Sequence, residues 1–150
     1  MTHLLTNRNM TMFQAARVAL FLALVTMAPG LLSAQQPCYP HQLQGSYAFY
    51  GTGSAAGLGQ ITMVGIETFD GAGNTTLTET ASFGGMIVRT GFSGTYKVNP
   101  DCSGTVVGTF PDGSTGHLDF VIAVRANNGM EIHAMESDTG VNLLITLIKQ

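Results

Sequence analysis

The sequence predicts an all-β protein: an eight-stranded antiparallel up-and-down barrel that follows an N-terminal signal peptide. Turn-forming residues recur at short intervals after residue 44, and the segments between them are rich in Thr, Val, Ile, Phe and Tyr. None of these segments keeps the period of an amphipathic helix. Short sequential connections give an antiparallel meander, and eight strands can close into a barrel without exposed edges. A two-sheet β-sandwich is the alternative that the same pattern allows.

The composition limits the class of protein. Of the 150 residues, 45% are hydrophobic and only 10% are charged, which excludes a coiled coil and a charged disordered tail. The length suits one domain, since ~100–200 residues per domain is usual. Six Lys and Arg against nine Asp and Glu leave no basic surface for a nucleic acid.

The first 34 residues have the three parts of a secretory signal peptide. Arg8 and Arg17 precede an apolar stretch, no acid occurs in this segment, and Leu-Ser-Ala34 supplies a small-residue exit. A membrane anchor would need ~20 apolar residues, and Pro29 and Gly30 interrupt the stretch. We therefore expect cleavage near Ala34.

Cleavage would leave residues 35–150 as a secreted or periplasmic barrel domain without a membrane attachment. Both cysteines, Cys38 and Cys102, stay in this domain, and both lie in turn-like sequence. In an oxidising compartment two cysteines of a small domain usually pair, whereas a catalytic thiol needs a base or a helix N-terminus beside it. We expect a disulfide between them.

The turn signals divide the mature chain into eight expected strands. The glycine-rich segment 51–59 has the wrong spacing for a dinucleotide-binding loop, and we interpret it as a flexible hairpin loop. The segment 70–74 has one carboxylate and lacks the later Glu of a calcium loop, so we interpret it as a turn. The strands are expected at residues 45–51, 58–69, 75–83, 86–98, 104–110, 116–126, 130–137 and 141–149.

Most expected strands have one apolar face, but the last one is apolar on both. In the sixth strand Leu118 and Phe120 alternate with His117 and Asp119, which is typical of a half-buried strand. The outer face of segment 141–149 is therefore expected to be covered, either by a partner subunit in a homo-oligomer or by a loop.

Three segments carry a resemblance to known proteins: Gly45–Phe49, Phe69–Asn74 and Gly94–Thr105. They resemble a group of small exported bacterial proteins of mostly unknown function, which are similar in outline to the allene-oxide-cyclase and lipocalin-like barrels. The motifs are turns and strand edges, so the resemblance implies the fold. No position of this sequence matches a catalytic residue of the plant cyclases, so the resemblance assigns no catalytic residue here.

Two carboxylates are the candidate catalytic residues. Glu67 and Glu79 each share parity with apolar neighbours on strands that flank the turn at 70–74. If Phe69 pairs with Thr75, the two carboxylates become diagonal neighbours ~7–8 Å apart on one face. Inside an apolar barrel they would lose water and repel each other, which raises a carboxyl pKa toward the range of a general acid or base. A register shift of one residue would instead turn this face outward.

A lumen lined by large apolar side chains is expected to hold a small hydrophobic molecule, since an eight-stranded barrel can either fill with side chains or enclose one small ligand. The first alternative is a cofactor-independent isomerase or cyclase acting on a lipid-like substrate, with Glu67 and Glu79 as acid and base. The second is a structural protein with a filled barrel. No cofactor motif occurs, and His41, His117 and His133 are expected to face solvent rather than bind a metal. The pocket candidates are Tyr47, Phe49, Met63, Phe83, Phe92, Tyr96 and Phe120.

Overall fold

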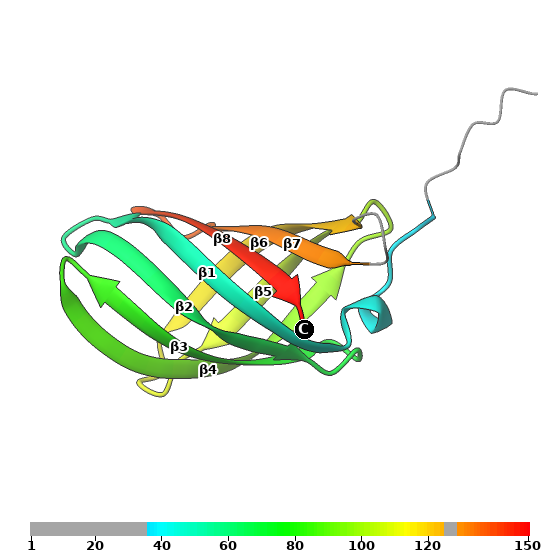
Figure 1. Ribbon diagram of the computed structural model, residues 1–150, viewed down its shortest axis with the longest axis horizontal. Helices are drawn as coiled ribbons and strands as arrows, with labels where there is room; N and C mark the ends of the chain where they lie inside the picture. Colours follow the sequence, from blue (N-terminus) through cyan, green and yellow to red (C-terminus); the bar gives the residue numbers. More distant parts are fainter. Residues whose placement is uncertain (1–35, 125–128) are drawn as a thin grey trace, which may run out of the picture. The chain divides into compact units, whose positions relative to one another are not determined.

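A computed structural model describes residues 36–124 and 129–150; the expected signal peptide at 1–34 lies outside the described residues. Eight strands form one closed antiparallel ring in sequence order (Figure 1). The ring closes because β1 pairs with β8, from Tyr47 opposite Lys149 to Ala55 opposite Val141. The barrel prediction is confirmed, and the sandwich alternative is wrong. Within the described ranges, no helix is both long enough and apolar enough to cross a membrane.

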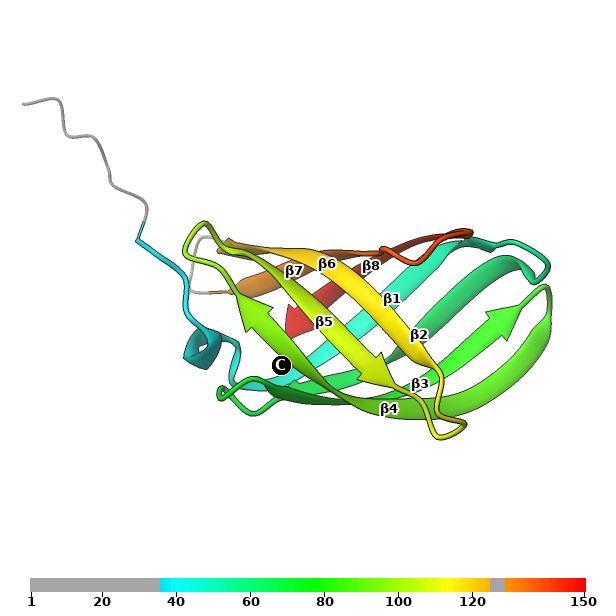
Figure 2. The ribbon, with the colours of Figure 1, turned by 180° about the vertical axis from the view of Figure 1, so that it is seen from behind.

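The observed strands lie close to the expected ones. A short 3-10 helix, which the sequence analysis did not predict, precedes them. The elements are η1 (Pro40–Leu43), β1 (Gly45–Ala55), β2 (Gly59–Phe69), β3 (Asn74–Phe83), β4 (Met86–Val98), β5 (Ser103–Thr109), β6 (Thr115–Val124), β7 (Met130–Glu136) and β8 (Val141–Lys149). Figure 2 shows the rear of the ring, where β5 lies between β4 and β6.

The glycine-rich segment differs from its prediction. We expected a flexible loop over 51–59, but β1 continues to Ala55 and only 56–58 form the turn. Gly53 lies opposite Leu143 of β8, where a Cβ would overlap the carbonyl oxygen of Asn142. Glycine here permits the close approach of two strands, which explains why a strand contains a sequence typical of a loop.

Inward-facing glycines also make room for aromatic rings. Gly65 of β2 lies opposite Phe49, and a Cβ on Gly65 would come within 2.7 Å of the Phe49 ring. Gly104 of β5 lies opposite Phe120, whose ring occupies the space of the missing Cβ. The ring of an aromatic residue laid over a cross-strand glycine compensates for the absent side chain.

One end of the barrel, which we call the closed end, is filled with side chains. Tyr47, Phe69 and Tyr96 form two edge-to-face contacts with centroids 5.3 and 5.0 Å apart. The η1 helix lies at this end and buries Leu43 completely (Figure 1). The hydroxyl of Tyr96 donates to the carbonyl oxygen of Pro40 at 3.0 Å, which ties η1 to β4.

A disulfide holds the chain that leads into the closed end. Cys38 and Cys102 are bonded, with their Cα atoms 4.9 Å apart, as the sequence predicted. The bond joins the segment before η1 to the β4–β5 turn, where the Cys38 N–H also donates to the carbonyl oxygen of Pro100 at 3.2 Å. Cys102 has a φ of 69°, a conformation that β-branched residues avoid.

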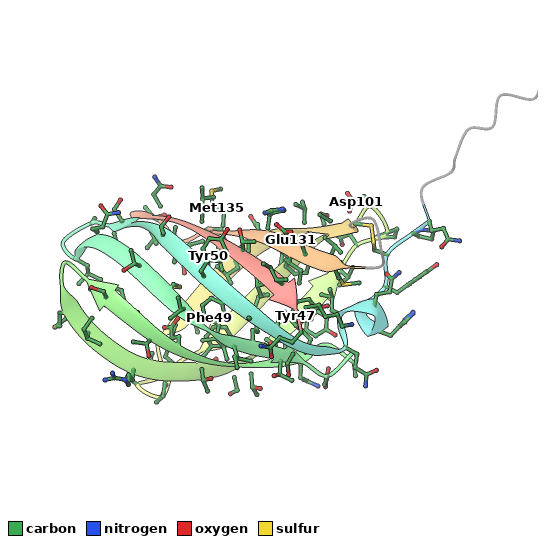
Figure 3. The ribbon with its side chains drawn as sticks, viewed as in Figure 1. Tyr47, Phe49, Tyr50, Asp101, Glu131 and Met135 are labelled. Atoms are coloured by element: carbon green, nitrogen blue, oxygen red, sulfur yellow. A yellow bond between two sulfur atoms is a disulfide. The ribbon has the colours of Figure 1, made fainter. Side chains whose placement is uncertain are left out.

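Among the described residues, no segment covers the outer face of β8. Leu144 and Ile148 are 61% and 47% exposed, and Tyr50 of the neighbouring β1 is also exposed (Figure 3). The expectation that a loop covers this face is therefore wrong. Its coverage by a partner subunit stays a prediction.

Candidate functional site

The other end of the barrel, which we call the open end, is hollow. Its mouth of about 580 Å³ is bordered by the turns between β1 and β2, β5 and β6, and β7 and β8, and by residues of β3 and β4. Beneath it lies an inner chamber of about 60 Å³. The mouth and the chamber share six lining residues, so they form one continuous cavity: Met63, Glu79, Phe110, Gly116, Glu136 and Leu143.

Glu67 sits at the floor of the chamber. The pairing of β2 with β3 places Phe69 opposite Thr75 and Glu67 opposite Leu77. This is the register for which we expected Glu67 and Glu79 to be diagonal neighbours on one face. The side chain is only 2% exposed, and its Oε1 accepts a hydrogen bond from the Thr75 hydroxyl at 2.8 Å. Burial raises the pKa of Glu67 to about 7, although the bond from Thr75 lowers it in part.

Glu79, on the neighbouring strand β3, lies closer to the mouth than Glu67 does. It pairs with Gly65, so it is a diagonal neighbour of Glu67 on the inner face. Its carboxyl makes no hydrogen bond to any residue of the described chain. Burial alone raises the pKa of Glu79. The Phe49 ring lies over Gly65, the residue that pairs with Glu79, and both Phe49 and Glu79 line the chamber.

Glu136 is a third inward carboxyl, and the sequence analysis missed it. It ends β7 opposite Leu118, on the parity of Ile132 and Ala134. That parity was a usable signal, because Glu136 falls inside the strand expected at 130–137. Burial and a carboxyl–carboxyl hydrogen bond with Asp138 raise the pKa of Glu136 to about 7.

A local backbone feature holds Glu136 and Asp138 at the rim of the mouth. The backbone N–H of His117 donates to Glu136 Oε1 and to Asp138 Oδ2, each at 3.1 Å. The His117 ring lies against Asp138, with Nδ1 at 2.8 Å from Oδ1. These contacts lower the pKa of Asp138, chiefly through the bond with Glu136 and then through that with His117.

The pocket candidates fall into two groups. Phe49, Met63 and Phe92 line the inner chamber, and Phe83 lines the mouth. The remaining three, Tyr47, Tyr96 and Phe120, are buried below the chamber in the closed end. Tyr47 lies near the end of β8, and Phe49 follows it toward the open end (Figure 3). The Tyr47 hydroxyl donates to the Met130 sulfur at 3.0 Å, and burial raises its pKa to about 12.

Several lining residues were not singled out from the sequence. Phe110 packs edge-to-face on Phe92 with centroids 5.5 Å apart, and both rings border the chamber. Leu143 and Ile145 come from β8, whose two apolar faces hid which side faces inward.

The histidines lie outside the cavity. His133 is exposed, with Nε2 at 3.3 Å from Oε1 of the buried Glu131, and His41 stacks on Tyr39 at 5.7 Å. In the described part of the chain, no group of three or more His, Cys, Asp or Glu side chains converges closely enough to hold a metal ion.

Comparisons with known proteins add little to this picture. No protein-family model matches the sequence, and no curated protein matches it. Among solved structures, the chain is similar to a de novo designed fluorescence-activating β-barrel, with 12% identity and a TM-score of 0.48. That similarity covers 74% of this chain and 96% of the designed one, and it concerns the β-barrel fold alone.

Proposed function

We propose that this protein binds a small, largely apolar molecule in the open end of its barrel. The observation that carries the proposal is the cavity of about 580 Å³ at the mouth, which continues into a chamber lined by Phe49, Met63 and Phe92. Small-molecule sites typically enclose about 300–1,000 Å³, with mostly apolar walls and a few polar groups. The carboxyls of Glu67, Glu79 and Glu136 are the polar side chains of the chamber.

Titration with N-phenyl-1-naphthylamine, a neutral dye that fluoresces in apolar surroundings, tests this function. We expect saturable binding to the folded protein. Gly116 offers a variant that narrows the neck, because its Cβ would lie 3.4 Å from the Phe110 ring and 3.6 Å from Glu136 Oε1. Gly116→Leu should weaken dye binding by about tenfold or more, the equivalent of about 1.4 kcal/mol.

The matched control places the same side chain on the outer surface. Thr95 is exposed on β4, so Thr95→Leu adds apolar area without touching the cavity. Dye binding that is unsaturable, or that Gly116→Leu and Thr95→Leu leave equally intact, would show that the cavity does not bind the dye.

A second candidate function is proton-transfer catalysis on a bound apolar substrate, without a cofactor. The buried Glu67 favours it, because its pKa of about 7 suits a general acid or base near neutral pH. Incubation with 2-tetralone in D₂O detects such a base, since it exchanges the ketone α-protons without a known natural substrate. Glu67→Gln and Glu79→Gln should abolish the accelerated exchange while leaving dye affinity in place; exchange that survives in both variants would exclude these residues.

We further propose that the protein acts after export, as a distant relative of small exported bacterial barrels. The Cys38–Cys102 disulfide supports an oxidising compartment. N-terminal sequencing of protein recovered from the periplasm or the medium should find a first residue near Gln35. Recovery of the uncleaved chain from the cytoplasm would contradict export.

A further inference from the structure

The polar lining of the cavity carries one sign of charge. The mouth and the chamber are bordered by five carboxyl side chains and, among the described residues, by no Lys, Arg or His. These acids are Glu67, Glu79, Asp112, Glu136 and Asp138. The His117 ring lies against Asp138 but does not itself border the cavity.

Two of these carboxyls face each other across the cavity. In a closed ring of eight strands, β3 and β7 are four strands apart and therefore lie on opposite walls. Glu79 projects inward from β3 and Glu136 from β7, and both border the chamber as well as the mouth. A ligand that enters the chamber passes between them.

The inward glutamates differ in how much acceptor capacity is left for a ligand. Glu79 has no hydrogen-bond partner within the described chain, and Glu67 accepts one bond, from Thr75. Glu136 accepts one bond from the His117 backbone N–H and shares another with Asp138. An ionised carboxylate can accept about four hydrogen bonds. Once ionised, these groups repel one another in a partly desolvated space without a compensating cation, a cost that a positively charged ligand group would remove.

The apolar walls add a second attraction for a cation. The rings of Phe49, Phe92 and Phe110 all border the chamber, and the face of an aromatic ring attracts an ammonium group within about 6 Å. A fatty acid, by contrast, would bring its carboxylate among like charges, which disfavours binding.

We propose that the ligand of this cavity is an apolar amine, a compact hydrophobic molecule whose protonated nitrogen lies between Glu79 and Glu136. The inference rests on the proposed small-molecule function and narrows it to one chemical class. Glu67 forms the floor under the apolar part of the ligand, and Phe92 and Phe110 flank it.

Three probes of one shape test the class: 1-naphthylmethylamine, neutral 1-methylnaphthalene and the anion 1-naphthylacetate, titrated by calorimetry at pH 8. A primary amine of this kind is largely protonated there. We expect the amine to bind about tenfold or more tighter than the neutral probe, because only the amine forms charge-assisted hydrogen bonds with the carboxylates. The anion should bind more weakly than either.

Charge-removing variants locate the nitrogen. Glu79→Gln and Glu136→Gln should each lower the ratio of amine to neutral affinity by about fivefold or more, since each removes one partner of the ammonium group. Asp119→Asn is the control, because Asp119 is an exposed acid on the outer face of β6; its removal should leave the ratio unchanged.

The outcomes separate this inference from the function on which it rests. Equal or tighter binding of the neutral probe or of the anion would overturn the amine inference and leave the small-molecule function standing. An amine preference that Asp119→Asn reduces as much as Glu79→Gln does would also overturn it. No saturable binding of any probe would overturn both.

Discussion

The two ends of the barrel are built from the same eight strands but from different side chains. Along β1 the inward positions run from Tyr47 at the closed end through Phe49 beside the chamber to Gly51, Gly53 and Ala55 at the mouth. This strand therefore contributes a large ring to the closed end, a second ring to the chamber wall, and no side chain larger than a methyl group at the mouth. The hollow follows from this gradient of side-chain size, because strand spacing in a barrel is fixed by backbone hydrogen bonds.

The tyrosine hydroxyls of the closed end and the Glu79 carboxyl of the open end differ in their hydrogen bonds. At the closed end, hydroxyls meet partners: Tyr96 donates to Pro40 and Tyr47 to Met130. At the open end the carboxyl of Glu79 has no partner in the described chain. A buried polar group with a partner adds to stability, whereas one without a partner costs free energy and is available to a ligand. The closed end is thus arranged for stability, whereas the open end has the cavity and the free acceptor that the proposed binding function requires.

Truncation of one phenylalanine at each end gives the largest expected contrast. Phe69→Ala removes a 2% exposed ring that contacts Tyr47 and Tyr96, and we expect a loss of about 3–5 kcal/mol in the free energy of unfolding. Phe83→Ala removes a partly exposed ring at the mouth, with a loss of about 1 kcal/mol or less. Urea unfolding followed by circular dichroism measures both. Equal losses would contradict the division into a filled and a hollow end.

Removal of the disulfide should weaken the closed end only. The double variant Cys38→Ser, Cys102→Ser opens a link between residues separated by 64 positions, and we expect a loss of about 2–4 kcal/mol in the free energy of unfolding. Dye affinity at a temperature where the variant stays folded should be unchanged, because the bond lies at the end opposite the mouth. A loss of dye binding in folded protein would show that the two ends are coupled.

The free energy of unfolding should depend on pH because the carboxyl of Glu67 is buried below the mouth. The pKa of Glu67 is about 7 in the folded protein against an ordinary value of 4.5, so the folded state holds a proton that the unfolded chain releases. The contribution of Glu67 to the free energy of unfolding is therefore largest below pH 4.5. This contribution is lost as the pH rises through 7. We expect the free energy of unfolding to fall by about 3 kcal/mol, because Glu67 is deeply buried.

The variant that isolates this effect is Glu67→Gln. It should flatten the fall in Tm between about pH 5 and pH 8, while Asp119→Asn should leave the wild-type slope in place. Glu136, with a pKa also raised to about 7, adds a smaller slope of the same sign because it is more exposed. A wild-type Tm that rises over this range would contradict the burial of Glu67.

Much of the fold was predictable because strand alternation and turn chemistry are local. Asp70 accepts bonds from the backbone N–H groups of Ala72 and Asn74, which makes the β2–β3 turn specific. A turn of fixed length fixes the register, and the register of Glu67 and Glu79 follows from it. The two carboxyls that flank this turn were therefore within reach of sequence reasoning.

The rest of the site depends on contacts between distant strands. Glu136 faces Glu79 because β7 lies across the ring from β3, and because Glu136 shares the inward parity of Ile132 and Ala134. Tyr47 and Tyr96 belong to the same buried cluster as Leu43 of η1, and the Tyr96 hydroxyl donates to Pro40 of η1. A four-residue 3-10 helix is too short to leave a periodic signal in the sequence.

The smallest predicted effect concerns a single hydroxyl at the closed end. Tyr96→Phe removes the bond to the Pro40 carbonyl oxygen, and we expect a loss of about 1 kcal/mol in the free energy of unfolding, since a partly buried acceptor loses its donor. Tyr50→Phe is the matched control, because the Tyr50 side chain is 55% exposed on the outer face of β1. Its hydroxyl exchanges with water, so its removal should change stability by less than about 0.5 kcal/mol. Equal values for the two variants would mean that η1 is held by the packing of Leu43 and the disulfide rather than by this hydrogen bond.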